Sequence, residues 1–226
     1  MTTYLDLPLV EQAILTVAAL VLVSAFALLA QSRVIATIHL FALQGVLLAG
    51  AASLVAWSSG ESHLYIAALM TLLLKTVFIP WLLVRQARRL GILKSVDTVI
   101  RPGLTLLVGG ALVIFCYAVA LPIGAYAEGS TRHAISLSLA VVMLSMLMLV
   151  TRRKAVTQVV AFMALENGMF FAAITATRGM PMVVELGVAF DVLVAAIIFG
   201  IFFFHIRDSI DSLDVDQLNR LSESEQ

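Results

Sequence analysis

Seven apolar runs, each long enough to cross a lipid bilayer, constrain this chain more than any other feature of its sequence. A helix needs about 20 apolar residues to cross ~30 Å of hydrocarbon. Continuous apolar runs satisfy their backbone polar groups there as helices, whereas barrel strands alternate in polarity. We therefore predict an all-α, polytopic membrane protein of about seven transmembrane helices. The expected spans are Leu7–Ala30, Val34–Trp57, His63–Val84, Pro102–Tyr126, Ala134–Val150, Ala155–Thr177 and Met182–His205.

The overall composition agrees with this prediction. Hydrophobic residues make up 62% of the chain, charged residues 12%, and the mean hydropathy is +1.06. These values lie far outside the range of water-soluble globular proteins. Met1–Leu7 contains no basic residue, so we expect no cleavable signal peptide and a first span that stays in the mature protein.

The distribution of basic residues predicts an orientation. Cytoplasmic connections of membrane proteins carry an excess of Lys and Arg. One side of the expected topology holds eleven of the 14 Lys and Arg residues, and the other holds Arg132 and Arg178. We therefore expect a multi-pass protein of the cell inner membrane with its N-terminus outside and its C-terminus in the cytoplasm. The eleven residues are Arg33, Arg85, Arg88, Arg89, Lys94, Arg101, Arg152, Arg153, Lys154, Arg207 and Arg220.

The first three and the last three spans have a similar layout, which indicates an internal repeat. A shift of 122 residues aligns Gln44 with Glu166 and Arg85 with Arg207. The span left between the two units is odd in number, so we expect both units to run in the same direction. The expected division is 1–98 for the first three-helix unit, 99–130 for a connector helix, 131–207 for the second unit and 208–226 for a polar cytoplasmic tail. This acidic tail is either disordered in solvent or docks on a cytoplasmic partner.

Three ionisable residues lie near the middle of apolar spans: Lys75, Glu166 and Asp191. Such a residue costs roughly 2.5–3.5 kcal/mol at the centre of a membrane helix, and it usually serves a function inside the membrane. Glu166 and Asp191 have similar depths and are expected to face each other on adjacent helices. The alternative for Glu166 is a carboxyl satisfied inside the bundle and kept for packing. We predict that these residues belong to an ion or proton path.

Lys75 has two interpretations of its own. It is a buried lysine that takes part in proton transfer with an apposed carboxylate, or it forms a static ion pair with Glu166 or Asp191. Pro80 follows five residues later and is expected to kink the helix, freeing a carbonyl that water or Thr76 satisfies.

Several further residues are candidates for the same path. Glu185 lies nearer the outer surface, where it either joins the path or pairs with Arg178. Asn167 and Gln44 are expected to support the path through hydrogen bonds between helices. His39 lies well within a span and is a supporting candidate, although a membrane histidine is more often a packing residue that forms a hydrogen bond.

Electron-carrying chemistry is not expected. Cys116 is the single cysteine, so the chain forms no intrachain disulfide and lacks the four or so thiolates of an iron–sulfur cluster. The four histidines are scattered and suggest no haem or metal site. We expect no cofactor and no metal.

The second half of the chain resembles the K subunit of respiratory complex I. The similarity consists of a basic turn at Arg152-Arg153, the sequence Ala-Leu-Glu-Asn at 164–167, Asp191 within the last helix and an Asp-rich tail. Over its whole length the chain is more similar to hydrogenase-4 component E, the K-like membrane subunit of formate hydrogenlyase-type group 4 hydrogenases. The segments that carry this likeness are 164–168, 177–181 and 184–193, with a looser match at 74–75 and 80–83.

The resemblance implies a non-redox subunit of a proton-translocating oxidoreductase complex, itself without catalytic residues, that lies beside antiporter-like membrane subunits. The Glu of the middle helix belongs to a proton relay in the K family, which assigns that role to Glu166. The acid of the last helix is usually Glu, whereas this chain has Asp191, one methylene shorter. Lys75 has no counterpart in a three-helix K subunit. Two alternatives remain open, a stand-alone secondary transporter and a purely structural membrane scaffold.

Overall fold

The chain is a bundle of membrane-spanning helices. The structure is a computed structural model that describes residues 8–89, 102–122, 129–177, 186–198 and 200. All regular elements in these residues are helices, and six helical stretches are long and apolar enough to cross a membrane. The predicted fold class, an all-α polytopic membrane protein, is confirmed.

Six of the seven expected spans correspond to helical stretches long enough to cross a membrane, whereas the seventh corresponds to a shorter helix in the described residues. The first two form a hairpin, α1 (Leu9–Ala30) and α2 (Val34–Ser59). The third span is continuous over His63–Arg89 but consists of three segments, α3 (His63–Thr71), the π-helical η2 (Leu72–Phe78) and α4 (Ile79–Arg89). The remaining elements are α5 (Pro102–Ala120), α6 (Gly129–Thr151), α7 (Ala155–Ala176) and a shorter apolar helix, Leu186–Ile198.

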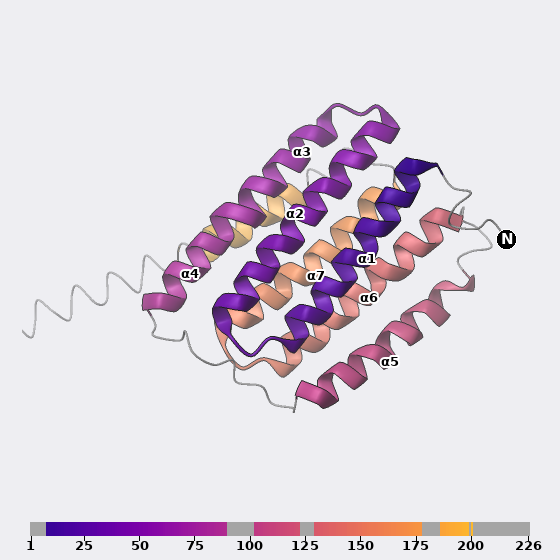
Figure 1. Ribbon diagram of the computed structural model, residues 1–226. Coiled ribbons are helices and arrows are strands. Elements are labelled where there is room, and N and C mark those ends of the chain that lie inside the picture. The colour runs from indigo at the N-terminus through magenta and orange to yellow at the C-terminus, as the bar shows by residue number, and fades with distance from the viewer. Residues whose placement is uncertain (1–7, 90–101, 123–128, 178–185, 199, 201–226) are drawn as a thin grey trace, which may run out of the picture.

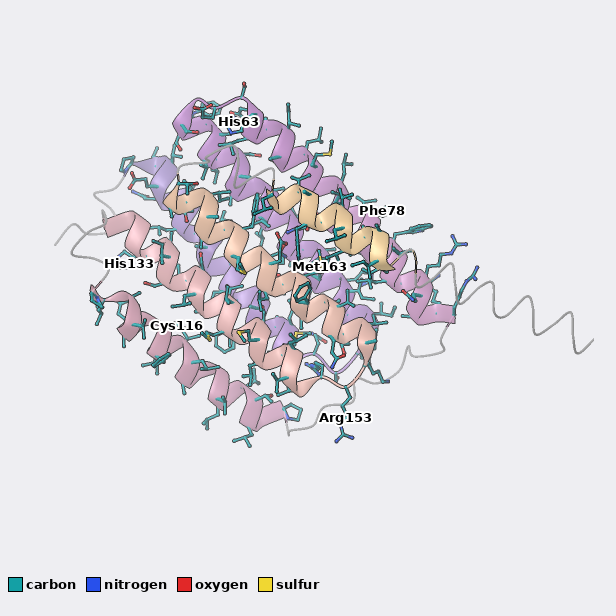
Figure 2. All side chains as sticks on the ribbon, turned by 180° about the vertical axis from the view of Figure 1, so that it is seen from behind. His63, Phe78, Cys116, His133, Arg153 and Met163 are labelled. Carbon is teal, nitrogen blue, oxygen red and sulfur yellow. The ribbon has the colours of Figure 1, made fainter. Side chains whose placement is uncertain are left out.

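The two halves of the chain pack side by side (Figure 1). α1 packs on α6, α2 packs on α7, and α5 lies at the edge against α6 and α1. The Leu186–Ile198 helix lies beside α7 and the third span, as Figure 2 shows from behind. The division into two repeated units stays a prediction, but the contacts show that neither half forms its core alone.

One end of the bundle gathers the basic connections. The α1–α2 connection, the α6–α7 connection and the start of α5 lie together at this end, and the α2–α3 connection lies at the opposite end (Figure 1). The two connections at the basic end include Arg33 and the triplet 152–154. This grouping is what the orientation rule requires, while the orientation itself stays a prediction.

The π-helical segment lies directly before Pro80. Proline has no N–H, and its ring clashes with the carbonyl four residues earlier, which here belongs to Thr76. A wider turn is one way for a helix to accommodate this, and such bulges are frequent at functional sites. The sequence suggested that the Thr76 hydroxyl or water satisfies the freed carbonyl. The hydroxyl instead donates to Ala42 O of α2 at 3.5 Å.

Arg152 is buried rather than exposed at the basic end of the bundle. Its side chain is 3% exposed, and its Nη2 donates to Leu28 O at 3.2 Å and Leu29 O at 2.6 Å. These carbonyls belong to the last turn of α1, where helix carbonyls lack partners within the helix. Burial lowers the pKa of the Arg152 guanidinium, which still stays charged at neutral pH. Arg152 therefore joins the second half of the chain to the end of α1.

Replacing Arg152 with Met should destabilise the protein, because the apolar stem is kept while two carbonyls of α1 lose their charged donor. Hydrogen bonds to charged groups are worth roughly 1.5–3 kcal/mol, and we expect a loss of that order in the free energy of unfolding. The neighbouring Arg153 is exposed and provides the matched control. Arg153→Met should change the free energy of unfolding by less than about 0.5 kcal/mol. Equal stabilities of the two variants in detergent would contradict the capping role of Arg152.

Candidate functional site: a buried lysine between two carboxylates

The centre of the site is the ammonium group of Lys75. Its Nζ donates hydrogen bonds to Glu166 Oε2 and to Asn167 Oδ1, the latter at 2.7 Å. Asp191 Oδ1 lies 3.2 Å from the same Nζ, within ion-pair distance. The structure therefore brings one cation against two carboxylates and one amide oxygen. We call Lys75, Glu166 and Asp191 the charged cluster.

Four helices supply these side chains. Lys75 lies in the middle of η2, and Glu166 and Asn167 are adjacent in α7. Asp191 comes from the Leu186–Ile198 helix, and α2 contributes Gln44. Lys75 and Gln44 belong to the first half of the chain and the other three to the second half. The site therefore exists only where the two halves meet.

An amide pair extends the site toward α2. Asn167 Nδ2 donates to Gln44 Oε1 at 3.1 Å. A lysine ammonium only donates hydrogen bonds, so it fixes Asn167 with its oxygen toward Lys75 and its NH₂ toward Gln44. Gln44 is fully buried, and its Nε2 has no hydrogen-bond partner among the described residues. An unsatisfied buried donor is costly, which marks this position as one that water or another acceptor would satisfy.

Burial makes the charge of the cluster energetically unfavourable. Lys75 and Asp191 are 1% exposed and Glu166 is 9% exposed. With all three groups ionised, one ammonium and two carboxylates carry a formal charge of −1. An uncompensated charge in an apolar interior is strongly unfavourable. One additional proton or one monovalent cation would make the cluster neutral.

The charged cluster separates two apolar parts of the core. One part contains Phe41, Ile79 and Met163, and the other contains Leu48, Leu64 and Phe171. On α2, Gln44 lies between Phe41 of the first part and Leu48 of the second. Glu166 is eleven residues from Ala155 and ten from Ala176, so at 1.5 Å per residue it is ~16 Å from either end of α7. The site is therefore a polar layer halfway along the bundle.

Close backbone packing holds the cluster in place. A Cβ added to Gly45 would lie 3.0 Å from Lys75 Cβ and 3.2 Å from its backbone carbonyl carbon. A Cβ on Gly187 would lie 2.7 Å from the Phe170 ring. This ring in turn lies with its centroid 5.6 Å from Lys75 Nζ, a distance at which a cation–π attraction is significant. The two glycines therefore let η2 and the Leu186–Ile198 helix approach their neighbours closely.

The structure brings most of the residues predicted from the sequence to one place. Lys75, Glu166, Asp191, Asn167 and Gln44 all contribute to the site, and Lys75 contacts both acids instead of one. Glu185 lies outside the described residues. His39 does not join the site, because it is exposed on α2 on a different side of the helix from Gln44. Among the described residues, no group of three or more His, Cys, Asp and Glu side chains is arranged to hold a metal ion.

Sequence reasoning missed Phe170, Gly45 and Gly187. Gly45 directly follows Gln44, and Gly187 precedes Asp191 by one helical turn. A small residue next to a polar one, or one turn from it, within a membrane helix indicates close helix contact. This pattern in the sequence could have identified both glycines. Phe170 is one turn after Glu166, but nothing in an apolar sequence distinguishes it from a lipid-facing ring.

Comparison with known proteins gives a distant relative. Over 187 residues the chain is 29% identical to a protein of Mycobacterium tuberculosis described as "Uncharacterized protein Rv0085". The match covers 82% of this chain and 85% of the relative. No family model matches the chain, and no solved structure matches it. The matched residues therefore include parts of both halves of the bundle.

The contact between Gly45 and Lys75 can be tested with one substitution at two positions of α2. Gly45→Ala should lower the free energy of unfolding by about 1–3 kcal/mol, because the added Cβ meets backbone as well as side chain of η2. Gly50→Ala is the matched control, since a Cβ there meets nothing within 4 Å. Alanine is the better helix former by up to ~1 kcal/mol, so this variant should be neutral or stabilising. Equal effects of both changes in chemical denaturation would show that η2 does not pack tightly on α2.

Proposed function

We propose that this chain is a non-redox membrane subunit of a proton-translocating oxidoreductase complex, and that the charged cluster is a step in its proton relay. The observation that carries the proposal is the buried contact of Lys75 with both Glu166 and Asp191 in the middle of the bundle. Ionisable residues at this depth are rare and usually mark ion pathways.

The arrangement of the cluster supports proton exchange. Lys75 forms a hydrogen bond with Glu166, whereas Asp191 Oδ1 is near Lys75 but accepts no hydrogen bond from the described residues. The two carboxylates therefore compete for one ammonium and differ in how well it satisfies them. A proton that neutralises one carboxylate lets Lys75 pair fully with the other. A proton can thus pass from one carboxylate to the other while the cluster as a whole stays neutral.

We propose the assembly of the complex on the basis of the sequence resemblance. Similarity to hydrogenase-4 component E and to the complex I K subunit suggests antiporter-like membrane subunits as partners. We propose the cell inner membrane as the location, with the basic end of the bundle in the cytoplasm. Apolar side chains exposed on the helices support association with the lipid bilayer. The electron-transfer centres would belong to other subunits.

Glu166→Gln should abolish most proton translocation while the complex still assembles. The amide keeps the volume of the side chain but cannot release a proton, and it leaves Lys75 paired with Asp191 in a neutral site. Turnover-coupled proton uptake in membrane vesicles measures the loss, and the amount of complex in the membrane measures assembly.

Two further results decide the interpretation of this variant. If both acids serve one path, the double variant Glu166→Gln/Asp191→Asn should pump hardly less than the more damaging of the two single variants. Wild-type proton uptake in Glu166→Gln would overturn the relay. A structural role would instead appear as loss of the assembled complex in the single variants.

A further inference from the structure

The Lys75 ammonium occupies a position built like a site for a monovalent cation. Its Nζ contacts Glu166 Oε2, Asn167 Oδ1 at 2.7 Å and Asp191 Oδ1 at 3.2 Å, with the face of Phe170 as a further wall. Carboxylate and amide oxygens are the ligands that hard cations prefer. Selectivity among cations depends on the number and field strength of such oxygens and on the size of the space.

The ammonium is part of the protein, so it cannot leave this position by diffusion. Lys75 projects from η2, whose backbone packs on Gly45 of α2. Its side chain is 1% exposed, and the neighbouring Asp191 is equally buried. A soluble Na⁺ or K⁺ ion would therefore have to displace a cation that is covalently attached. A proton needs no such space, because it binds to a carboxylate oxygen.

We propose that Lys75 is a specificity-determining residue, whose tethered ammonium fills the place of a monovalent metal ion so that the charged cluster exchanges protons and excludes Na⁺ and K⁺. This inference deepens the proposed function and rests on it. The residue acts by occupying the site, whereas Glu166 and Asp191 carry the exchangeable proton. Loss of the ammonium should convert a proton site into an alkali-cation site.

Lys75→Met tests the inference, because methionine reaches about as far as the Cε atom of lysine and leaves the position of Nζ empty. The purified full-length chain is unfolded thermally in detergent at mildly alkaline pH, with NaCl, KCl or choline chloride at equal ionic strength. The wild type should unfold at one temperature in all three salts. Lys75→Met should show a saturable rise in unfolding temperature with NaCl or KCl over choline chloride, since a bound ion stabilises the folded state. The rise should disappear in Lys75→Met/Glu166→Gln.

Two results would overturn the inference. One is a saturable effect of NaCl or KCl on the wild type, which would mean that Lys75 does not exclude these ions. The other is a folded Lys75→Met protein that behaves alike in all three salts. If Lys75→Met does not fold, Lys75→Ala is unfolded in the same three salts, with the same expected result.

A measurement on the wild type keeps the inference testable if neither variant folds. Proton uptake in vesicles should be the same in NaCl, KCl and choline chloride, and inhibition by either metal ion would contradict exclusion. The unfolding test involves no turnover, so it tests cation exclusion alone. The proton relay is tested separately, by proton uptake in the Glu166→Gln variant.

Discussion

The pairing of one buried ammonium with two buried carboxylates is the interaction on which the rest of this structure depends. Each charge alone would be too costly in an apolar bundle, and together they still leave one negative charge to be compensated. Lys75 and its two acids come from different halves of the chain. The halves must therefore associate for the charges to be satisfied.

Local features of the helices serve this pairing. The π-helical turn before Pro80 contains Lys75, and Gly45 lets that turn contact α2 closely. The amide of Asn167 connects Lys75 to Gln44, so the polar layer continues across α7 into α2. Apolar core lies on either side of this layer. In the proposed relay, a proton that crosses the bundle would pass the apolar parts by way of water or movement of side chains, and the cluster would be the step between them.

The sequence predicted the helical spans well, because about 20 consecutive apolar residues permit little else in a membrane. It also predicted that Lys75, Glu166 and Asp191 lie inside the bundle, since charges within such spans are conspicuous, while their role stays a prediction. The simultaneous contact of Lys75 with both acids was not predictable, because it depends on how η2 and the last helix are rotated. The burial of Arg152 was missed for a related reason. The positive-inside rule counts basic residues near helix ends but says nothing of the carbonyls that they bind.

The protonation of the cluster is the most direct test of this account. Infrared spectroscopy of the protein in membranes, recorded in H₂O and in D₂O, detects the C=O stretch of a protonated carboxyl. We expect a band from one buried carboxyl near neutral pH that shifts in D₂O and is lost or changed in Glu166→Gln and Asp191→Asn. Two permanently ionised carboxylates, with no such band in the wild type, would contradict the account and identify the cluster as a static ion pair.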